Sequence, residues 1–546
     1  MKKWMVVLLV LIGMRGMGQV PTWEWARGVI GTTGGAAECW DLAIDNSQSI
    51  YITGCFTDST LTFGANILYN TGNSNSMRYY IAKYDSSGNI AWAKGAGSSD
   101  EAVGFGITVD INGNIYVTGY YYSSTITFDT ITLFNNGGNL AFFLVKYNSS
   151  GNVLWARGGD GSHNSYGNDI TSDTYGNIYL TGGFIDTISF DSYTLLNGGA
   201  FITKYNSLGQ VLWSNGGQIN GNAGQSITTD VFGNVYMTGY FWPSIIFDTD
   251  TLYSNGSNDI FLIKYNSSGN IIWIRSAGGT QNDRSLSIST DRSGNIYNSG
   301  YFTSPSIIFG NDTLVNTSLY DTYLTKFDSS GNVLFAKTFG GTSTNIGWNL
   351  VVDSLGKIYL MGEYSSSITF DTITLPSPSG TDPLFLVIFD SIGNALYAKT
   401  LTSGGDDWGG LAVGTNGSIY IGEDFEGANT FIVGNDTLIK TGGEDIFVAK
   451  LIFQSIEGIP QISPQPTISL SPNPFSTSAT LLIKGELKEN SHLYIYNLIG
   501  QEAKTIPIIN QKEITINRDN LADGMYFYKI IGDKNETIAV GKMVIE

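Results

Sequence analysis

The chain has 546 residues, which is too long for one ordinary hydrophobic core and indicates a repeat array or several domains. Only 14% of the residues are charged, whereas Gly (68), Tyr (31) and Phe (28) are abundant, a composition typical of an all-β protein with many turns. The formal net charge is −19. Because residues 1–18 carry +3 and residues 467–546 carry −1, the region between them carries −21. Such a surface repels phosphate backbones and argues against nucleic acid as a partner.

The first segment of the chain is predicted to be a signal peptide. Lys2 and Lys3 precede a short apolar run, and Gly16 and Gly18 are small residues suited to the −3 and −1 positions of a cleavage site. We therefore expect residues 1–18 to be removed on export. The apolar run is too short to span a bilayer and no later segment approaches that length, so no transmembrane segment is predicted in the mature protein.

A unit of about sixty residues then recurs, and a fixed period of this size is typical of repeat architectures. Each unit contains four strand signals, joined by short turns such as Asp110-Ile-Asn-Gly-Asn114, in which Gly accepts positive φ. Four strands in a meander form one blade of a β-propeller. The clearest anchor of the unit is an Ile-Tyr or Val-Tyr pair, whose seven tyrosines are Tyr51, Tyr116, Tyr179, Tyr236, Tyr297, Tyr359 and Tyr420.

The ends of the repeat region predict that it closes on itself. The last unit stops after its third strand signal at residues 446–451, whereas the Trp-type strand at Trp25 has no strand before it. If the N-terminal strand completes the last blade, both sheet edges are hidden. The prediction is therefore a seven-bladed β-propeller of four-stranded blades over residues 19–453. Its long connections lie on one face, where we expect ligand contacts.

The repeats are similar to a known family. The segments KYNSSGNVLWARGG (146–159) and DTYGNIYLTGGF (173–184) resemble the β-propeller repeats of bacterial surface proteins called SBBP repeats. The resemblance covers roughly residues 23–451. It implies a propeller and an extracytoplasmic location, but no particular activity.

The two cysteines, Cys39 and Cys55, flank one predicted hairpin. If Asp45 pairs with Ser49 across its turn, the two cysteines also face each other. A cross-strand disulfide in an oxidising compartment and two buried thiols are the two alternatives.

Little in the repeats predicts covalent chemistry or a metal. His163 and His492 are the only histidines, which argues against a Ser-His-Asp triad or a two-histidine metal site. Asp110, Asn112 and Asn114 place oxygens at positions 1, 3 and 5, as a calcium loop does, but Gly falls at position 4 and Tyr121 at position 12. A hairpin turn is the favoured interpretation. No cofactor is predicted, and calcium is the alternative.

Acidic residues gather in the last two repeats. Glu363 and Glu423 each follow a glycine of a second-strand signal, and an enzymatic function would place them at equivalent positions of adjacent blades, because two acids at a suitable separation can hydrolyse or eliminate on a sugar. The other interpretation is a solvated acidic rim or cation site that includes Asp406 and Asp407.

Aromatic residues near the loop face are the favoured binding candidates. Trp40, Phe105 and Trp348 share one repeat position, five residues before the acid of the inner strand or its equivalent; Trp408 lies one position earlier in its copy, and Trp242 lies in a long connection. Flat rings beside Asn and Asp suit carbohydrate or peptide surfaces, whereas packing between blades is the alternative. The candidate ligand-binding residues are Trp408, Trp242, Trp348, Asp406 and Asp407.

After the repeats, residues 454–466 contain three prolines and are predicted to be an extended linker. Residues 467–546 regain strand-like alternation and predict a small β-sandwich. Their motifs resemble the type A C-terminal sorting domain of type IX secretion, although Ala522-Asp523 stands where that family usually has a Pro. The motif residues are Pro472, Asn473, Pro474, Gly524, Tyr526, Gly541 and Lys542.

This resemblance implies export across the inner membrane and then passage through the type IX secretion machinery to the surface of a Gram-negative bacterium of the Bacteroidota. The sorting domain is usually removed, and the protein is released or anchored. We therefore predict a secreted or cell-surface propeller that binds or adheres to a glycan or protein without catalysis. The alternatives are a polysaccharide hydrolase or lyase that uses Glu363 and Glu423, and a passive structural protein.

Overall fold

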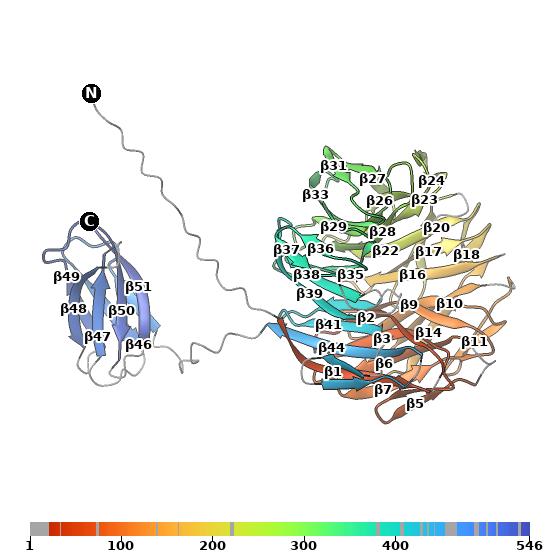
Figure 1. Cartoon of the computed structure of the whole chain (residues 1–546), viewed down its shortest axis with the longest axis horizontal. Coiled ribbons are helices and arrows are strands. Elements are labelled where there is room, and N and C mark those ends of the chain that lie inside the picture. Colours follow the sequence, from red (N-terminus) through yellow and green to blue (C-terminus); the bar gives the residue numbers. More distant parts are fainter. Residues whose placement is uncertain are drawn as a thin grey trace. The chain divides into compact units, whose positions relative to one another are not determined.

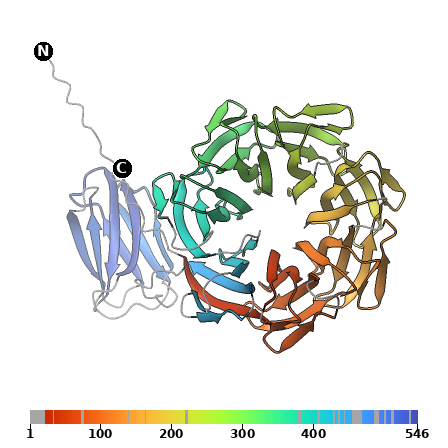
Figure 2. The ribbon, with the colours of Figure 1, turned by 45° about the vertical axis from the view of Figure 1, so that its right-hand side comes forward.

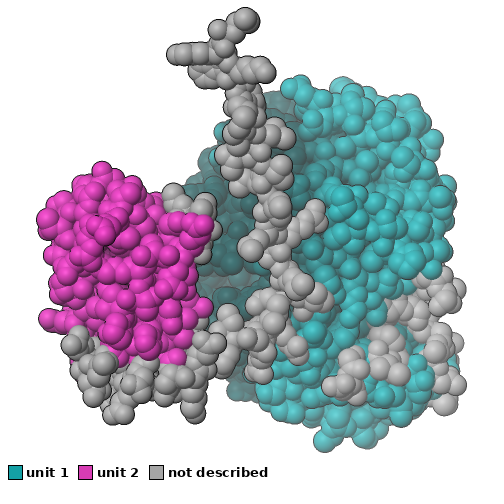
Figure 3. All heavy atoms as spheres, turned by 60° about the vertical axis from the view of Figure 1, so that its left-hand side comes forward, with its two compact units in different colours: residues 1–454 teal, residues 455–546 magenta. Residues whose placement is uncertain are grey.

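The chain forms two compact units, residues 1–454 and residues 455–546 (Figures 1 and 3). The predicted signal peptide (1–18) and linker (454–466) lie outside the residues that the structure describes. No helix among the described residues is long and apolar enough to cross a membrane. The structure, a computed structural model, describes residues 21–546 except for 33, 72–75, 138–139, 162, 219–222, 378–382, 404–408, 426–429, 434–435, 442, 454–466, 485–490, 498–500, 509–511 and 533–536.

The first unit is built from antiparallel sheets that repeat one strand order. In each repeat the first strand pairs with the second, the second with the third and the third with the fourth, as in β9-β10-β13-β14. Within the described residues this order occurs seven times. The first strands are β2 (Ala37–Ile44), β9 (Ala102–Val109), β16 (Ser165–Ser172), β22 (Ala223–Thr229), β28 (Asp283–Thr290), β34 (Asn345–Val352) and β40 (Gly410–Val413). The second strands are β3 (Ile50–Phe56), β10 (Ile115–Tyr121), β17 (Ile178–Phe184), β23 (Val235–Phe241), β29 (Ile296–Phe302), β35 (Ile358–Tyr364) and β41 (Ile419–Phe425).

The third and fourth strands continue each sheet outwards. The third strands are β6 (Arg78–Tyr84), β13 (Ala141–Tyr147), β20 (Gly199–Tyr205), β26 (Asp259–Tyr265), β32 (Asp321–Phe327), β38 (Pro383–Phe389) and β44 (Asp445–Phe453). The fourth strands are β7 (Ile90–Gly95), β14 (Val153–Gly158), β21 (Val211–Gly216), β27 (Ile271–Ala277), β33 (Val333–Phe339), β39 (Ala395–Ser403) and, for the last sheet, β1 (Pro21–Gly31).

The sheets follow one another around a ring (Figure 2). Each first strand contacts the first strand of the next repeat, and β40 contacts β2, so the inner circle is continuous. The N-terminal strand β1 pairs with β44, with Trp25 opposite Lys450 and Val29 opposite Ile446. The offset of the Trp-type strand predicted this pairing. The pairing covers the edge of β44 that would otherwise be open, and it gives the last sheet the same four strands as the others.

A short hairpin joins the second and third strands of every repeat. These hairpins occupy part of the connections that the sequence identified as long loops. They are β4 (Thr60–Phe63) with β5 (Asn66–Tyr69), β11 (Thr125–Phe128) with β12 (Ile131–Phe134), β18 (Ile188–Phe190) with β19 (Tyr193–Leu195), β24 (Ser244–Phe247) with β25 (Asp250–Tyr253), β30 (Ser306–Phe309) with β31 (Asp312–Val315), β36 (Ile368–Phe370) with β37 (Ile373–Leu375), and β42 (Thr430–Val433) with β43 (Asp436–Ile439). Two-residue strands β8 (Gly97–Ser98) and β15 (Asp160–Gly161) extend two of them.

The apolar core of this unit lies between neighbouring sheets. Strands such as β3 and β13 are buried along their whole length, because each sheet has another sheet on both faces. One core cluster, for example, joins Tyr51 and Tyr79 of one sheet to Ile107, Ile115 and other residues of the next. Tyrosines rather than aliphatic residues fill much of this space, and Tyr51, Tyr79 and Tyr116 are each at most 1% exposed.

The second unit contains two antiparallel sheets, β45-β46-β49 and β48-β47-β50-β51, with one shared apolar core. That core includes Leu481, Ile495, Ile516 and Ile530. The strands are β45 (Thr467–Ser471), β46 (Ser478–Lys484), β47 (Ser491–Tyr496), β48 (Glu502–Ile508), β49 (Glu513–Asn517), β50 (Gly524–Ile531) and β51 (Thr537–Ile545).

Candidate functional site

The turns that carry the repeat motif are closed by their own aspartate. Asp110 is 4% exposed and follows β9. Its Oδ1 accepts hydrogen bonds from the backbone N–H groups of Asn112 (2.8 Å) and Asn114 (3.0 Å), and its Oδ2 accepts from Asn114 Nδ2 (2.8 Å) and Tyr116 Oη (2.9 Å). The hairpin interpretation of this segment is confirmed by the pairing of Ile115 with Val109. These four donors within the turn use the oxygens that a calcium loop would offer to the ion.

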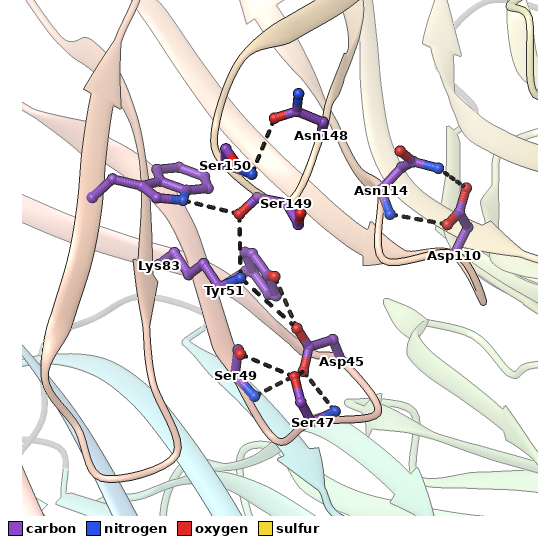
Figure 4. Close-up of polar contacts among 11 residues, drawn as sticks. Asp45, Ser47, Ser49, Tyr51, Lys83, Asp110, Asn114, Asn148, Ser149 and Ser150 are labelled. Atoms are coloured by element: carbon purple, nitrogen blue, oxygen red, sulfur yellow. Dashed lines mark hydrogen bonds and ion pairs between the residues drawn. The ribbon is translucent and has the colours of Figure 1, made fainter.

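The anchor tyrosine belongs to a set of contacts that joins its turn to the neighbouring sheet (Figure 4). Tyr51 donates to Asp45 Oδ2 at 2.9 Å, and Lys83 Nζ lies 4.9 Å from the centroid of the Tyr51 ring. Lys83 also donates to the carbonyl oxygen of Ser149, in a turn of the next sheet, at 3.2 Å. Trp92 Nε1 donates to the same carbonyl at 3.3 Å. Burial, and then the charge of Asp45, raises the pKa of Tyr51, so its hydroxyl remains a donor.

The glycine of the turn that contains Ser149 leaves room for Trp92. Gly151 has φ 81°, and a Cβ atom there would lie 2.9 Å from Cδ2 of Trp92. Glycine is thus required for both its backbone conformation and its lack of a side chain. The same aromatic-on-glycine contact occurs for Trp25 and Gly88, Trp155 and Gly209, Trp213 and Gly269, Trp273 and Gly331, and Phe335 and Gly393. The repeat motif therefore fastens neighbouring sheets at six of the seven junctions among the described residues, and we call this Asp–Tyr–Lys–Trp–Gly set the inter-sheet latch. The sixth repeat has Ile388 in place of the lysine.

The seventh repeat completes its latch with a residue from the first. Gly414 stands where six other turns have Asp, and Gln48 stands where six other turns have Gly. Gln48 adopts φ 64°, and its Oε1 accepts a hydrogen bond from Tyr420 Oη at 3.1 Å. A Cβ atom on Gly414 would lie 2.0 Å from that Oε1. The Gln48 side chain thus occupies the space of the missing aspartate across the junction between the last and first repeats.

The opposite part of the inner strands contains a different repeated feature, a β-bulge. Six first strands have one extra residue at the same place, between the pairing positions Cys39/Asp41, Gly104/Gly106, Gly167/Asp169, Gly224/Ser226, Ser285/Ser287 and Gly347/Asn349. Bulges redirect a side chain and are common beside functional sites. The six bulged residues are Trp40, Phe105, Asn168, Gln225, Leu286 and Trp348. We call this set the bulge ring.

The bulge ring surrounds a central cavity of about 380 Å³, to which all seven first strands contribute. Five of its six side chains fall into two groups around the circle, and the sixth, Leu286, comes from the fifth repeat between them. Trp348, Trp40 and Phe105 form an aromatic wall from the sixth, first and second repeats, with the Trp40 and Phe105 rings packed edge to face at 4.5 Å. Asn168 and Gln225 of the third and fourth repeats form an amide wall. The volume lies in the range typical of small-molecule sites.

The residue after the bulge bonds neighbouring sheets together in several repeats, and Asp41 and Asp169 are two examples. Asp41 Oδ2 accepts from the backbone N–H of Ile107 in the next sheet at 2.8 Å. Asp169 Oδ2 accepts from Ile227 N at 2.8 Å and from Ser226 Oγ at 2.7 Å. Burial outweighs these hydrogen bonds and raises the pKa of Asp169 to about 6; burial, and then the charge of Asp169, raises the pKa of Asp41.

The predicted binding residues fall in different places. Trp348 lies in the bulge ring and lines the cavity. Trp242, after β23, is 52% exposed and is not among the residues that line this cavity. Trp408, Asp406 and Asp407 lie outside the described residues. Sequence reasoning missed Asn168 and Gln225, although both stand five residues before the turn aspartate, as Trp40 does.

The two candidate catalytic acids are buried, but the expectation that they occupy equivalent positions is wrong. Glu363 pairs with Leu384 and is the fourth residue after its anchor tyrosine, whereas Glu423 pairs with Phe447 and is the third, so Asp424 is the equivalent of Glu363 and the two glutamates project from opposite faces of their strands. They are 9% and 0% exposed, so neither belongs to a solvated rim. A Cβ atom on Gly409 would lie 1.5 Å from Glu423 Oε2, which places that carboxylate behind the inner wall of the seventh repeat. The described lining of the central cavity includes neither acid.

The two cysteines are free, buried thiols, and the expected facing register is wrong. Ala43 does pair with Tyr51, as the turn predicts, but the bulge at Trp40 shifts the pairs beyond it, so that Cys39 lies opposite Gly54 and Cys55 opposite Glu38. The two side chains therefore project from opposite faces of the sheet. Cys55 Sγ donates to Glu38 Oε2 at 3.2 Å.

The sorting-motif residues mainly hold the second unit together. Asn473 Oδ1 accepts from Val544 N at 2.8 Å, and its Nδ2 donates to the carbonyl of Lys542 at 3.2 Å, so the Pro472–Pro474 segment is fastened to the last strand. Tyr526 Oη donates to the carbonyl of Ala522 at 3.0 Å. A Cβ atom on Gly541 would lie 2.3 Å from Cζ of Tyr528, which explains the need for glycine there.

Comparisons with known proteins match both units. A family model described as a beta-propeller repeat (SBBP) matches residues 95–120, and one described as a secretion system C-terminal sorting domain matches residues 469–546. The chain therefore carries a propeller repeat of the SBBP kind and a sorting domain, as the sequence resemblance implied. The sorting domain indicates export by the type IX secretion system.

The chain is also similar to two curated relatives. A WD repeat-containing protein of Acanthamoeba polyphaga mimivirus is 26% identical over 412 residues, covering 60% of this chain and 29% of the relative. The regulatory protein FlaEY of Caulobacter vibrioides is 27% identical over 176 residues, covering 30% of this chain and 18% of the relative. The chain thus spans less than a third of the length of these relatives.

Solved structures with similar strand arrangements are distant. They include a fungal alcohol oxidase in complex with copper (14% identity, TM-score 0.39, 96% of this chain and 99% of that one). A Dyadobacter fermentans protein of unknown function has 10% identity and a TM-score of 0.35, with 79% and 99% covered. PorZ, a surface component of the type IX secretion system of Porphyromonas gingivalis, has 9% identity and a TM-score of 0.18, with 95% and 100% covered. Identities and TM-scores this low carry no inference about function.

Proposed function

We propose that the protein is an exported seven-bladed β-propeller with a C-terminal β-sandwich, and that it holds an extracellular ligand in its central cavity without catalysing a reaction. The observation that carries this proposal is the bulge ring. One extra residue at the same place in six inner strands turns six side chains towards one cavity of about 380 Å³. The identity of these side chains changes from repeat to repeat more than that of the latch residues.

Hydrogen-bonding capacity left unused in the cavity supports a binding role over a passive structural one. The amide of Gln225 makes no hydrogen bond within the part of the chain that the structure describes. Asn168 Nδ2 donates to the carbonyl of Gly224 at 2.9 Å, and the described residues provide no partner for its Oδ1. Structural polar groups in this protein, such as Asp110, instead have their partners inside the fold.

The positions of the acids favour binding over polysaccharide cleavage. A hydrolase or lyase needs two carboxyl groups that reach the same sugar. Asp41 and Asp169 line the cavity, but their oxygens accept backbone N–H groups of neighbouring sheets. Glu363 and Glu423 are buried within their sheets. If the rival function held, Glu363→Gln or Glu423→Gln would abolish turnover of a glycan while leaving the fold intact.

Export places this cavity outside the cell. The sorting domain carries the protein through the type IX secretion machinery, its partner during export, to the cell surface or the medium. The acidic middle of the chain keeps the exported propeller soluble and disfavours anionic partners.

The test is a screen of the exported protein against glycan and matrix-protein arrays, repeated with Trp348→Ala. We expect saturable retention of one ligand class that falls at least tenfold in the variant and does not change when a chelator replaces calcium. Retention that is equal in both proteins would place the site elsewhere. Loss in chelator would make calcium part of the site.

A further inference from the structure

The two walls of the central cavity differ in chemistry. Around the ring, the aromatic wall (Trp348, Trp40, Phe105) stands across from the amide wall (Asn168, Gln225), because Gln225 is three repeats from Trp40 in one direction and four in the other. Gly409, with φ 51°, takes the corresponding position of the seventh repeat and adds no side chain between Trp348 and Trp40. A ligand that fills this space meets flat apolar rings on one side and hydrogen-bonding amides on the other.

From this arrangement we propose that the cavity takes one uncharged pyranose unit at the end of a glycan, an inference that rests on the proposed function. The C–H face of a pyranose suits an aromatic ring, whose face carries partial negative charge. Its hydroxyl groups, each both donor and acceptor, suit amides, which offer both kinds of partner. The Gln225 amide is such a partner, and the second N–H and the Oδ1 of Asn168 are others.

Charge restricts the sugar further. Asp41 and Asp169 both line the cavity, and each oxygen of these carboxylates already accepts at least one hydrogen bond from the fold. Neither has a cationic partner among the described residues that line the cavity. A uronic acid, sialic acid or sulfated sugar would add negative charge without a cation beside carboxyl groups whose charged forms burial already disfavours, and this opposes binding. The ligand is therefore a neutral hexose or an N-acetylated hexosamine.

Size favours a single terminal unit over a continuous chain. A cavity of about 380 Å³ is at the small end of ligand sites, which span roughly 300–1,000 Å³. A peptide loop would have to bury backbone N–H and C=O groups against the aromatic wall, where no partners stand. A sugar ring presents its polar groups at its rim, and these meet the amide wall.

The experiment measures the dissociation constants of the exported protein for matched neutral and anionic oligosaccharides by isothermal titration calorimetry. Three variants are compared: Trp348→Ala, Gln225→Leu and Trp242→Ala. We expect binding of neutral sugars to weaken about 10- to 100-fold in Trp348→Ala, because a stacking surface is lost. It should weaken about tenfold in Gln225→Leu, which removes hydrogen bonds at nearly constant volume. Trp242→Ala, at an exposed tryptophan outside the cavity lining, is the matched control and should bind as the native protein does.

The outcomes separate this inference from the proposed function. If only anionic sugars or peptides bind, and Trp348→Ala or Gln225→Leu weakens them, the cavity is a binding site but the pyranose assignment is wrong. If nothing binds, or if only Trp242→Ala weakens binding, both the assignment and the proposed function are wrong. Gln225 makes no internal hydrogen bond in the described structure, so Gln225→Leu keeps the test decisive if Trp348→Ala fails to fold.

Discussion

The two ends of the same inner strands differ in what their side chains do. At one end, every turn uses nearly the same residues, and their polar atoms are consumed inside the fold, as the four hydrogen bonds to Asp110 show. At the other end, the bulged residue ranges from Trp to Gln to Leu, and its side chain faces a cavity. The residues that recur in nearly every repeat therefore explain how the repeats assemble, whereas the bulged residues, which vary, are the candidates for function.

The largest effect on stability is expected when the buried aspartate of a latch is replaced. Asp110→Ala leaves the donors of Asn112, Asn114 and Tyr116 without their acceptor in a site that is 4% exposed. We expect the free energy of unfolding to fall by about 3 kcal/mol, the cost of several buried groups left unpaired. All 11 tryptophans precede residue 454, so tryptophan fluorescence during urea unfolding reports on the first unit alone.

The matched control is Asp85→Ala. Asp85 makes the same kind of turn bonds, to Ser87 N and Asn89 N at 2.9 Å each, but in an exposed hairpin. Its loss should cost about 0.5 kcal/mol, as is usual at the surface. Equal losses of stability in the two variants would mean that the buried turns stabilise the fold no more than the exposed ones. This would contradict the role in assembly assigned to the buried turns.

A smaller effect is expected from pH, through Asp169 beneath the bulge ring. Burial raises the pKa of this carboxyl from its ordinary 3.8 to about 6 in the folded protein. Between these values the folded state binds the proton more tightly than the unfolded state, so the contribution of this carboxyl to stability is fully present below pH 3.8 and is lost as pH rises through about 6. We expect the decline in stability from pH 4.5 to pH 7 to be about 2 kcal/mol smaller in Asp169→Asn, which cannot titrate.

The measurement compares urea midpoints at pH 4.5 and pH 7 for the native protein and Asp169→Asn. Asp41 titrates in both proteins, but burial and then the charge of Asp169 raise its pKa, so its pKa should be lower in Asp169→Asn and the comparison reports on the two carboxyls together. Identical pH dependence in the two proteins would contradict the raised pKa of Asp169.

The sequence predicted the parts of this molecule that repeat, because alternation, Gly-Asn turns and the displaced Trp strand each have a direct structural meaning. The pairing of β1 with β44 is an example. The sequence could not predict the bulge, because one extra residue leaves the alternation of apolar residues intact on both sides of it. The bulge at Trp40 moved Cys39 opposite Gly54 and removed the expected facing of the cysteines. The same displacement turned Trp40, Asn168 and Gln225 towards the cavity, so one local irregularity hid both features.

The smallest expected effect concerns the junction where the latch is shared between repeats. Gln48→Asn keeps a residue that tolerates the left-handed φ of 64° but is too short to reach Tyr420, so it should lower the free energy of unfolding by about 1 kcal/mol. Gly414→Asp alone should give no gain, because its Cβ would lie 2.0 Å from Gln48 Oε1. Combined with Gln48→Asn, however, Gly414→Asp provides Tyr420 with the aspartate acceptor that the anchor tyrosines of the other six repeats have, and stability should return.

Urea unfolding of the four proteins gives the coupling free energy between positions 48 and 414, which we expect to be about 1 kcal/mol and favourable. Additive effects would show that the two side chains act independently and that the seventh repeat has no substitute for its aspartate. A favourable coupling would mean instead that ring closure depends on a side chain exchanged across the junction. In that case the sequence drift of the seventh repeat is compensated by the first, because Gln48 takes the acceptor role of the missing aspartate.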